Sequence, residues 1–200
     1  MRYRLAKRCL DICLAALALL ILAPVLAFIS LCIWLGDPGA PVVFRQSRCG
    51  LGGRRFELFK FRTMVRNADA LKESLRAQSL VAWPDFRVPD DPRVTRLGRL
   101  LRTTSLDELP QLVNVLRGDM SLVGPRPTSF DASTYTLWQT ARLDFRPGIT
   151  GPWQVDGRRS MDFTERCRLE ISFFRRRSLA GELWVLIRTA GCVIRRTGVA

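Results

Sequence analysis

Residues 12–35 read ICLAALALLILAPVLAFISLCIWL and contain no charged side chain. A straight helix of this length would extend roughly 36 Å, which is enough to cross the hydrocarbon core of a bilayer. A cleaved signal peptide also begins with basic residues, but its apolar region is shorter and ends at a small-residue cleavage site, which is not convincing here. A buried core helix is the other alternative, but few domains of 200 residues contain one so long and apolar. The run therefore predicts a helix that is inserted in a membrane.

Pro24 stands in the middle of this run, where its ring would clash with the carbonyl of Leu20 and kink or break the helix. Basic residues flank the run on both sides, namely Arg2, Arg4, Lys7 and Arg8 before it and Arg45, Arg48, Arg54 and Arg55 after it. Because cytoplasmic flanks are enriched in Lys and Arg, we expect a helix that is broken at Pro24, enters the bilayer and returns. A kinked helix that crosses once is the alternative. Asp11 is expected to pair with Lys7 or Arg8 at helical spacing, since facing lipid would be costly.

The composition of the chain narrows the functional classes. With 48% hydrophobic and 25% charged residues, the chain is too apolar for a disordered protein. It contains no His, which excludes His-dependent catalytic triads and zinc or haem sites with His ligands. None of its six cysteines has C-x-x-C spacing, so we expect them to be reduced and structural in a protein that faces the cytosol.

The formal net charge of +14 indicates an anionic partner. Anionic lipid headgroups and phosphorylated substrates both fit this charge. Nucleic acid is suggested by the charge alone, because no nucleic-acid motif is present and the aromatic residues are not interleaved with the basic clusters. We therefore expect no nucleic-acid partner.

Residues 37–200 are predicted to form a cytosolic domain of the α+β class that is mostly helical. Turn residues separate two short apolar pieces between residues 37 and 63, which indicates a β-hairpin. Helices are expected over about residues 64–82, 93–117 with a bend at Pro110, 129–143, 162–176 and 179–196. Loops are expected over residues 83–92 and 118–128, and irregular or short-strand structure over residues 146–157. The last helix alternates apolar and basic residues, which suits either a membrane surface or the core.

The centre of the chain, TTSLDELPQ at residues 103–111, carries the candidate chemistry. Asp107 and Glu108 would point about 100° apart on a helix, so adjacency alone does not make them a catalytic pair. Ser105 and Glu108 also fit a capping box, which is a structural role. However, cations recur nearby beside turns and prolines, above all Arg126 in a stiff Pro-Arg-Pro unit that suits a bidentate grip on phosphate. A carboxylate in this setting can hold Mg²⁺ with substrate phosphates or attack phosphorus itself.

Several stretches together resemble the bacterial sugar transferase family, the small monotopic phosphoglycosyl transferases. They are, in chain order, Lys7-Arg8 with Asp11, Phe44-Arg45-Gln46-x-Arg48-x-Gly50, Phe56-x-x-x-Lys60-Phe61-Arg62-Thr63-Met64, SLDELPQL at residues 105–112, NVLRGDMSLVGPRP at residues 114–127 and RPGITG at residues 146–151. The match extends in order over nearly the whole chain, and the stretch from residue 105 to 127 is highly specific.

The resemblance implies an enzyme that transfers a sugar phosphate from a UDP-sugar to a polyprenol phosphate, here undecaprenyl phosphate, and releases UMP. This reaction is the first membrane step in the assembly of a bacterial glycan such as an exopolysaccharide or lipopolysaccharide. The resemblance also implies a broken re-entrant membrane helix over residues 1–36, with both ends cytoplasmic. The catalytic domain would lie at the cytoplasmic face of the bacterial inner membrane, with inner-membrane lipids as partners, and a homo-oligomer is compatible with this arrangement.

For the site, the resemblance implies that Asp107 is the nucleophile of a covalent phosphosugar intermediate, that Glu108 completes the dyad and that Mg²⁺ lies beside Asp107. The matching cations are candidates for binding the phosphates and the nucleotide: Lys60, Arg62, Arg102, Arg126, Arg146 and Arg158. Glu170 and Glu182 stand where the family commonly has Asp, and no role is predicted for them. Two alternatives stay open, namely a non-catalytic membrane adaptor and a single displacement without a covalent intermediate.

Overall fold

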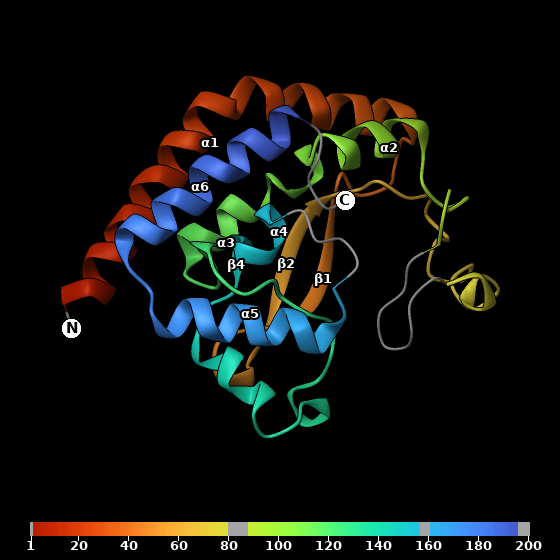
Figure 1. Cartoon of the computed structure of the whole chain (residues 1–200). Helices are drawn as coiled ribbons and strands as arrows, with labels where there is room; N and C mark the ends of the chain where they lie inside the picture. The colour runs from red at the N-terminus through yellow and green to blue at the C-terminus, as the bar shows by residue number, and fades with distance from the viewer. Residues whose placement is uncertain (1, 80–87, 157–160, 196–200) are drawn as a thin grey trace.

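The structure is a computed structural model that describes residues 2–79, 88–156 and 161–195. The α-helices of this part are α1 (Arg2–Gly36), α2 (Arg96–Thr103), α3 (Gln111–Arg117), α4 (Pro152–Val155), α5 (Phe163–Arg175) and α6 (Leu179–Ile194). The strands are β1 (Val43–Cys49), β2 (Arg55–Phe61), β3 (Ser121–Val123) and β4 (Gly148–Thr150). The short 3₁₀ segments are η1 (Leu51–Gly53), η2 (Arg76–Gln78), η3 (Leu106–Glu108), η4 (Ala132–Thr134) and η5 (Gln139–Asp144). In Figure 1, α1 arches over the domain, the β1–β2 hairpin runs through its middle and α5 lies in the lower part, above the segment that contains η4 and η5.

α1 is a single helix, and Pro24 lies inside it. Figure 1 shows that this helix bends over the top of the molecule, and a bend is how a long helix accommodates a proline. The structure therefore shows one bent helix and not the predicted break at Pro24. The re-entrant path of this helix in a bilayer stays a prediction.

The distal part of α1, residues 16–36, exposes large apolar side chains. Leu20 is 75% exposed, Phe28 is 66% exposed and Leu35 is 61% exposed. A core helix of a soluble protein would bury such side chains, so that alternative does not fit. Within the described residues, α1 is the one helix that is long and apolar enough to cross a membrane. Its length, apolar composition and exposure make it a candidate membrane span.

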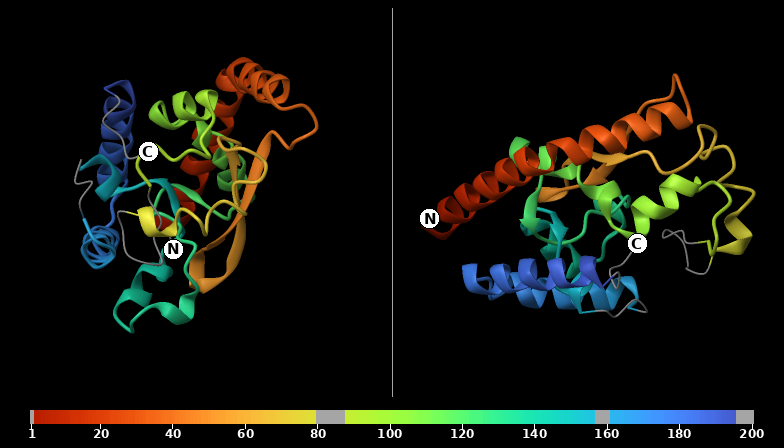
Figure 2. Two further views of the ribbon diagram at one scale, coloured as in Figure 1. Left: turned by 90° about the vertical axis from the view of Figure 1, so that its right-hand side faces the viewer. Right: turned by 90° about the horizontal axis from the view of Figure 1, so that it is seen from above.

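Buried polar contacts fasten the beginning of α1, residues 3–15, which we call the α1 root. Asp11 is only 1% exposed, accepts a hydrogen bond from Ser121 Oγ at 2.8 Å and from a backbone N–H of β3 at 3.2 Å, and forms an ion pair with Lys7. Lys7 also pairs with Glu182 of α6 at 2.7 Å. The predicted pairing of Asp11 with Lys7 is thus confirmed. The right-hand view of Figure 2 shows α1 and α6 closest at this end and diverging towards the other.

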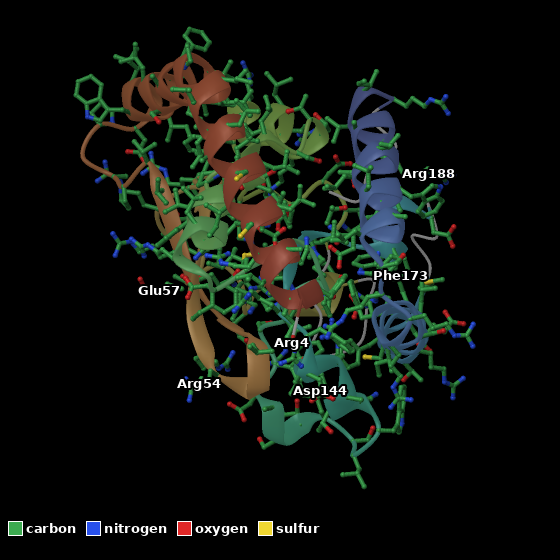
Figure 3. All side chains as sticks on the ribbon, turned by 90° about the vertical axis from the view of Figure 1, so that its left-hand side faces the viewer. Arg4, Arg54, Glu57, Asp144, Phe173 and Arg188 are labelled. Carbon is green, nitrogen blue, oxygen red and sulfur yellow. The ribbon has the colours of Figure 1, made fainter. Side chains whose placement is uncertain are left out.

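α3 is held between α1 and the hairpin. β1 and β2 pair antiparallel over their whole lengths, which confirms the predicted hairpin, and Figure 3 shows Arg54 at its tip, far from the distal part of α1. The Asn114 side chain of α3 pins β2, because it accepts a hydrogen bond from Phe59 N at 3.0 Å and donates one to Glu57 O at 2.7 Å. From the other side, Arg8 of the α1 root donates to two carbonyls at the C-terminal end of α3, at 2.6 and 3.0 Å.

β3 and β4 form a parallel pair that the sequence did not predict, with Ser121 opposite Gly148. The two strands lie close because glycines stand where they meet. A Cβ on Gly124 would lie 2.3 Å from the carbonyl oxygen of Arg146, and a Cβ on Gly148 would lie 2.0 Å from the Gly124 nitrogen. Only residues without a Cβ permit this approach. The pair fixes the start of the loop that carries Arg126.

Two of the other expected helices are replaced by turns and 3₁₀ segments, and two are present. Residues 64–79 form turns with mostly i→i+3 backbone hydrogen bonds in place of the first part of the helix expected over residues 64–82, and residues 80–87 lie outside the described part. The segment 129–143 likewise contains η4 and part of η5 instead of one helix; there the Asp131 side chain accepts from Ser133 N, which competes with helical pairing. The helices expected over residues 162–176 and 179–196 are confirmed as α5 and α6.

Two apolar clusters form the core and position the centre of the chain. The larger cluster joins the α1 root, α3, β3, α5 and α6. The smaller one joins Ile29 and Ile33 of the distal part of α1 to Phe61 of β2 and Leu101 of α2, with Leu106 packed against it. η3 therefore lies between the two clusters, beside the apolar part of α1. All six cysteines are free, as expected.

Candidate active site

η3 is a single turn between α2 and α3 that carries both candidate carboxylates. Ser105 precedes it with a φ of 58°, in the left-handed region that few residues other than glycine adopt. The Ser105 side chain makes no capping hydrogen bond, so the capping box with Glu108 is not formed. The bend expected at Pro110 therefore begins earlier, at the end of α2. Successive residues of a 3₁₀ turn point about 120° apart, so the two carboxylates face different neighbours.

Asp107 is a buried carboxylate. It is 8% exposed, and none of the described residues donates a hydrogen bond to it. Burial raises its pKa; the positive charge of Lys60 opposes this rise, and the neighbouring Glu108 adds to it. A carboxylate whose negative charge is poorly stabilised is more basic and a better nucleophile.

Glu108 is the opposite case, because one of its oxygens holds two cations. Its Oε1 accepts from Lys60 Nζ at 2.8 Å and from Arg126 at 2.7 Å. Burial alone would raise its pKa, but the charges of Arg126 and Lys60 and their hydrogen bonds lower it to about 2. Glu108 is therefore ionised at neutral pH. Neighbouring carboxylates whose environments move their pKa values apart are typical of active sites with divided roles.

Arg102 approaches Asp107 from α2. Its Nε donates to Thr63 Oγ1 at 3.0 Å, just after β2. α2 lies this close because Gly98 faces the same residue: a Cβ there would be 2.0 Å from the Thr63 carbonyl oxygen. Burial lowers the pKa of Arg102, while the charge of Asp107 opposes that change. The structure thus brings Lys60, Arg102 and Arg126 together around the two carboxylates.

The other predicted cations lie elsewhere. Arg62 donates to the carbonyls of Ile33 and Asp37, at 3.5 and 3.4 Å, so it caps the C-terminal end of α1 and does not contact the dyad. Arg146 is half-buried just before β4, and no hydrogen bond or ion pair in the described part joins its side chain to either carboxylate. Arg158 lies outside the described residues.

The residues at η3 suit a metal ion that is bound partly by the protein and partly by a substrate. In the described part of the chain no group of three acidic, His or Cys side chains could hold a metal ion. Mg²⁺ does not require such a group, because it commonly binds one or two carboxylates together with phosphates and water. The Asp107 carboxylate has no donor among the described residues, so its oxygens are available as ligands, whereas Glu108 Oε1 is taken by two cations. A Mg²⁺ held by Asp107 and substrate phosphates is consistent with this donor set.

Two residues near the site have no role in the sequence prediction, namely Arg142 and Glu170. Glu170 is fully buried. One of its oxygens accepts a hydrogen bond from the backbone N–H of Arg126, and the other accepts one from the Arg142 side chain. A sequence signal was available: on α5 the acid stands in the stripe formed by Cys167, Ile171 and Phe174, at the spacing of a buried helix face. An acid in such a stripe needs a buried partner.

Comparison with known proteins places the chain among sugar transferases. The family model described as "Bacterial sugar transferase" matches residues 2–196. The chain is 41% identical over 196 residues to "Galactosyl transferase CpsE" of Streptococcus agalactiae, covering 97% of this chain and 43% of that protein. It is 39% identical over 202 residues to "Undecaprenyl-phosphate galactose phosphotransferase" of Salmonella typhimurium, covering 98% and 42%.

A third relative is more nearly matched in length. The chain is 43% identical over 194 residues to "UDP-glucose:undecaprenyl-phosphate glucose-1-phosphate transferase" of Caulobacter vibrioides, covering 92% of this chain and 68% of that protein. The chain thus spans less than half the length of the first two relatives and about two thirds of the third. Because the family model covers nearly every residue, including η3 and its cations, this chain belongs to the bacterial sugar transferase family.

Proposed function

We propose that this protein transfers a sugar 1-phosphate from a UDP-sugar to undecaprenyl phosphate, with release of UMP, as the first membrane step of bacterial glycan assembly. The observation that carries the proposal is the contrast at η3: Asp107 is buried and receives no hydrogen bond from any described residue, beside a Glu108 that holds two cations. The names of two relatives support the donor and acceptor classes, because the Salmonella typhimurium relative is named for undecaprenyl phosphate and the Caulobacter vibrioides relative for UDP-glucose as well.

In the first step, a carboxylate oxygen of Asp107 attacks the phosphorus that carries the sugar. The bond between this phosphorus and the bridging oxygen breaks, and UMP leaves with the electron pair. In the second step, a phosphate oxygen of undecaprenyl phosphate attacks the same phosphorus, and the bond to Asp107 breaks, which restores the carboxylate. Phosphoryl transfer depends on positioning and charge neutralisation, so a chain without His can perform it.

The cations around η3 supply that neutralisation. Lys60 and Arg126 are held by Glu108 on one side of the turn, and Arg102 is held by Thr63. Preorganised charges of this kind stabilise a transition state because they do not have to reorient during the reaction. When bound by Asp107 and the donor phosphates, Mg²⁺ would add Lewis-acid neutralisation of the diphosphate.

The acceptor is a lipid, so the proposal also requires η3 to be near the bilayer. We place the distal part of α1 in the cytoplasmic leaflet of the inner membrane as a re-entrant helix, with both ends cytoplasmic. Its exposed apolar side chains, its bend and the basic residues on both flanks support this placement. α2 packs on Ile29 and Ile33 of the same part of α1, which brings η3 to the side from which the acceptor would come. Labelling of introduced cysteines before and after α1 should find both ends on the cytoplasmic side; opposite sides would exclude the re-entrant path.

A UMP-release assay with a panel of UDP-sugars, undecaprenyl phosphate and Mg²⁺ tests the reaction. We expect turnover with one or a few sugars, dependent on the acceptor. In the absence of acceptor, mass spectrometry of the protein should find a phosphosugar on Asp107. Acceptor-dependent UMP without any such adduct would favour a single displacement. No UMP with any sugar, together with intact biological function of Asp107→Asn, would favour a non-catalytic adaptor.

A further inference from the structure

The loop that presents Arg126 has few backbone N–H groups that could form stabilising hydrogen bonds. Pro125 and Pro127 stand on either side and have no N–H group, so Arg126 supplies the one N–H of this unit. The Pro125 carbonyl accepts from Gly148 N at 2.9 Å, which fastens the loop to β4. The position of the Arg126 guanidinium therefore depends on what binds the peptide groups of this residue.

Both peptide groups of Arg126 are bound by one ion pair from elsewhere in the chain. Arg126 N donates to Glu170 Oε1 at 2.9 Å, and the Arg126 carbonyl accepts from Arg142 at 2.9 Å. The same two residues bind each other: Arg142 donates to Glu170 Oε2 through Nε at 3.0 Å and through its terminal nitrogen at 2.6 Å. We call this arrangement the Arg126 clamp. It joins α5 and η5 to the loop, and it leaves neither Glu170 oxygen without a partner.

Packing does not replace the clamp on this side of the loop. Glu170 is 0% exposed and Arg142 is 5% exposed, so the ion pair itself is deep in the protein. However, a cavity of about 90 Å³ borders Arg126, Pro127 and both clamp residues. A loop beside a cavity can shift into it if its hydrogen bonds are lost, because no side chains fill the space.

We propose that Glu170 and Arg142 are positioning residues for the transfer reaction: the clamp sets where Arg126 stands between Glu108 and the phosphates of the nucleotide-sugar donor. The inference rests on the proposed function. Neither residue is placed in contact with substrate. Stability alone is a weak reason for such a pair, since apolar residues of similar volume often replace a buried ion pair without loss. The clamp also explains why an acid stands on the apolar face of α5.

Single substitutions test the clamp against a matched control. Glu170→Gln replaces one carboxylate oxygen, which accepts a hydrogen bond, by an NH₂ group, which cannot accept one. The clamp therefore loses its hydrogen bonds to one of the two Glu170 oxygens. We expect the KM for the UDP-sugar and the Kd for UMP to rise about tenfold, and the KM for undecaprenyl phosphate to stay within about twofold. Glu182→Gln is the control: Glu182 is an acid on the neighbouring helix, 3% exposed, that pairs with Lys7 at the α1 root. It should lower the melting temperature similarly and leave the UMP affinity unchanged.

The double variant Glu170→Leu with Arg142→Met separates positioning from stability. It removes both charges together, so the melting temperature should recover most of what Glu170→Gln loses. The Arg126 peptide groups would still lack their partners. We therefore expect UMP binding to remain about tenfold weaker than in the wild type. Recovery of UMP affinity together with stability would overturn the inference, because the pair would then act only through the fold.

Failure of the inference is distinguishable from failure of the proposed function. If the wild-type protein neither binds UMP nor releases it from any UDP-sugar, the proposed function fails. If the wild type binds and releases UMP but Glu170→Gln and Glu182→Gln behave alike, the clamp has no positioning role. Isothermal titration with UMP and steady-state kinetics with each substrate varied in turn give both answers on the same preparations.

Discussion

The α1 root, with Glu182 of α6 packed against it, and the η3 turn each bring two acids together, but the contacts of the two pairs differ. At the root, Asp11 and Glu182 share Lys7 between them, and Asp11 also accepts from Ser121. At the turn, Glu108 takes two cations on one oxygen while Asp107, the next residue back, has no donor in the described part of the chain.

Under the proposed function, the difference separates acids that are paired within the fold from an acid that is kept for chemistry. A buried ionised group costs several kcal/mol unless it is paired, so each paired acid is explained by the fold alone. Asp107 is not explained in this way, because burial disfavours its charge and raises its pKa. Proteins retain such a cost mainly at functional sites, where stability is lost in exchange for activity. Asp107 is therefore the residue whose removal should help the fold and abolish the function.

The largest expected effect comes from Asp107→Asn. Loss of the nucleophile should reduce UMP release at least about 1,000-fold. Because the same change removes a poorly stabilised buried charge, the melting temperature should rise by about 2–4 °C, the shift expected for roughly 1 kcal/mol in a domain of this size. Kinetics and thermal unfolding of the same preparation measure both. A less stable variant would mean that Asp107 has a partner in the folded protein and belongs with the root acids.

Glu108→Gln should combine a loss of activity with a loss of stability. The amide keeps one acceptor but no charge, so Lys60 and Arg126 would repel each other and move from their places. We expect activity to fall about 100-fold and the free energy of unfolding to fall by about 1.5–3 kcal/mol. Glu57→Gln is the matched control, because Glu57 lies on β2 of the hairpin, is 60% exposed and reaches Arg45 only at 3.7 Å. If the two variants lost the same activity and the same stability, the carboxylate of the η3 turn would matter no more than an exposed carboxylate of the hairpin.

Asp11→Asn should affect the root alone. The change removes hydrogen bonds and an ion pair made by a charged, 1% exposed group, which corresponds to a loss of about 1.5–3 kcal/mol in the free energy of unfolding. The KM for the UDP-sugar of the remaining folded enzyme should be unchanged, since the hydrogen bonds and the ion pair of Asp11 in the described part of the chain reach Lys7 and β3 and not η3. Denaturation in detergent and donor kinetics check this. A rise in the donor KM would show that the root and the turn are coupled.

Local patterns predicted the parts of the fold that local forces determine. The long apolar run, the hairpin and the two helices at the end of the described chain follow from periodicity and turn residues. The parallel pair β3–β4 was missed because it joins strands of three residues each that are far apart in the sequence, and only Gly124 and Gly148 mark their contact. Over residues 64–79 the expected helix is replaced by turns, because helical spacing alone does not outweigh local turn hydrogen bonds.

The site was predicted unevenly for a similar reason. Asp107, Glu108, Lys60 and Arg126 meet as expected, because they lie in or beside the motifs that carried the family resemblance. Their environments were not predictable, since burial of one acid and the pairing of the other depend on contacts across the fold. Arg62 and Arg102 look alike in the sequence, yet the first caps α1 and the second reaches the turn. The clamp on Arg126 was missed because both clamp residues lie outside those motifs, and the acid in the apolar stripe of α5 indicates a buried partner without identifying it.

The smallest expected effect is a shift of the acid limb of the pH–rate profile. In the proposed reaction Asp107 must be ionised to attack, so the rate should fall as the pH falls through its raised pKa. Glu108, with a pKa of about 2, should not contribute to that limb. Among the nearby charges Lys60 lowers the pKa of Asp107 most, so Lys60→Met should move the limb to higher pH. Lys7→Met removes a cation of the root and should leave the limb in place. If both variants keep the wild-type profile, the limb reports another group, and the isolation of Asp107 would not be what sets the reaction.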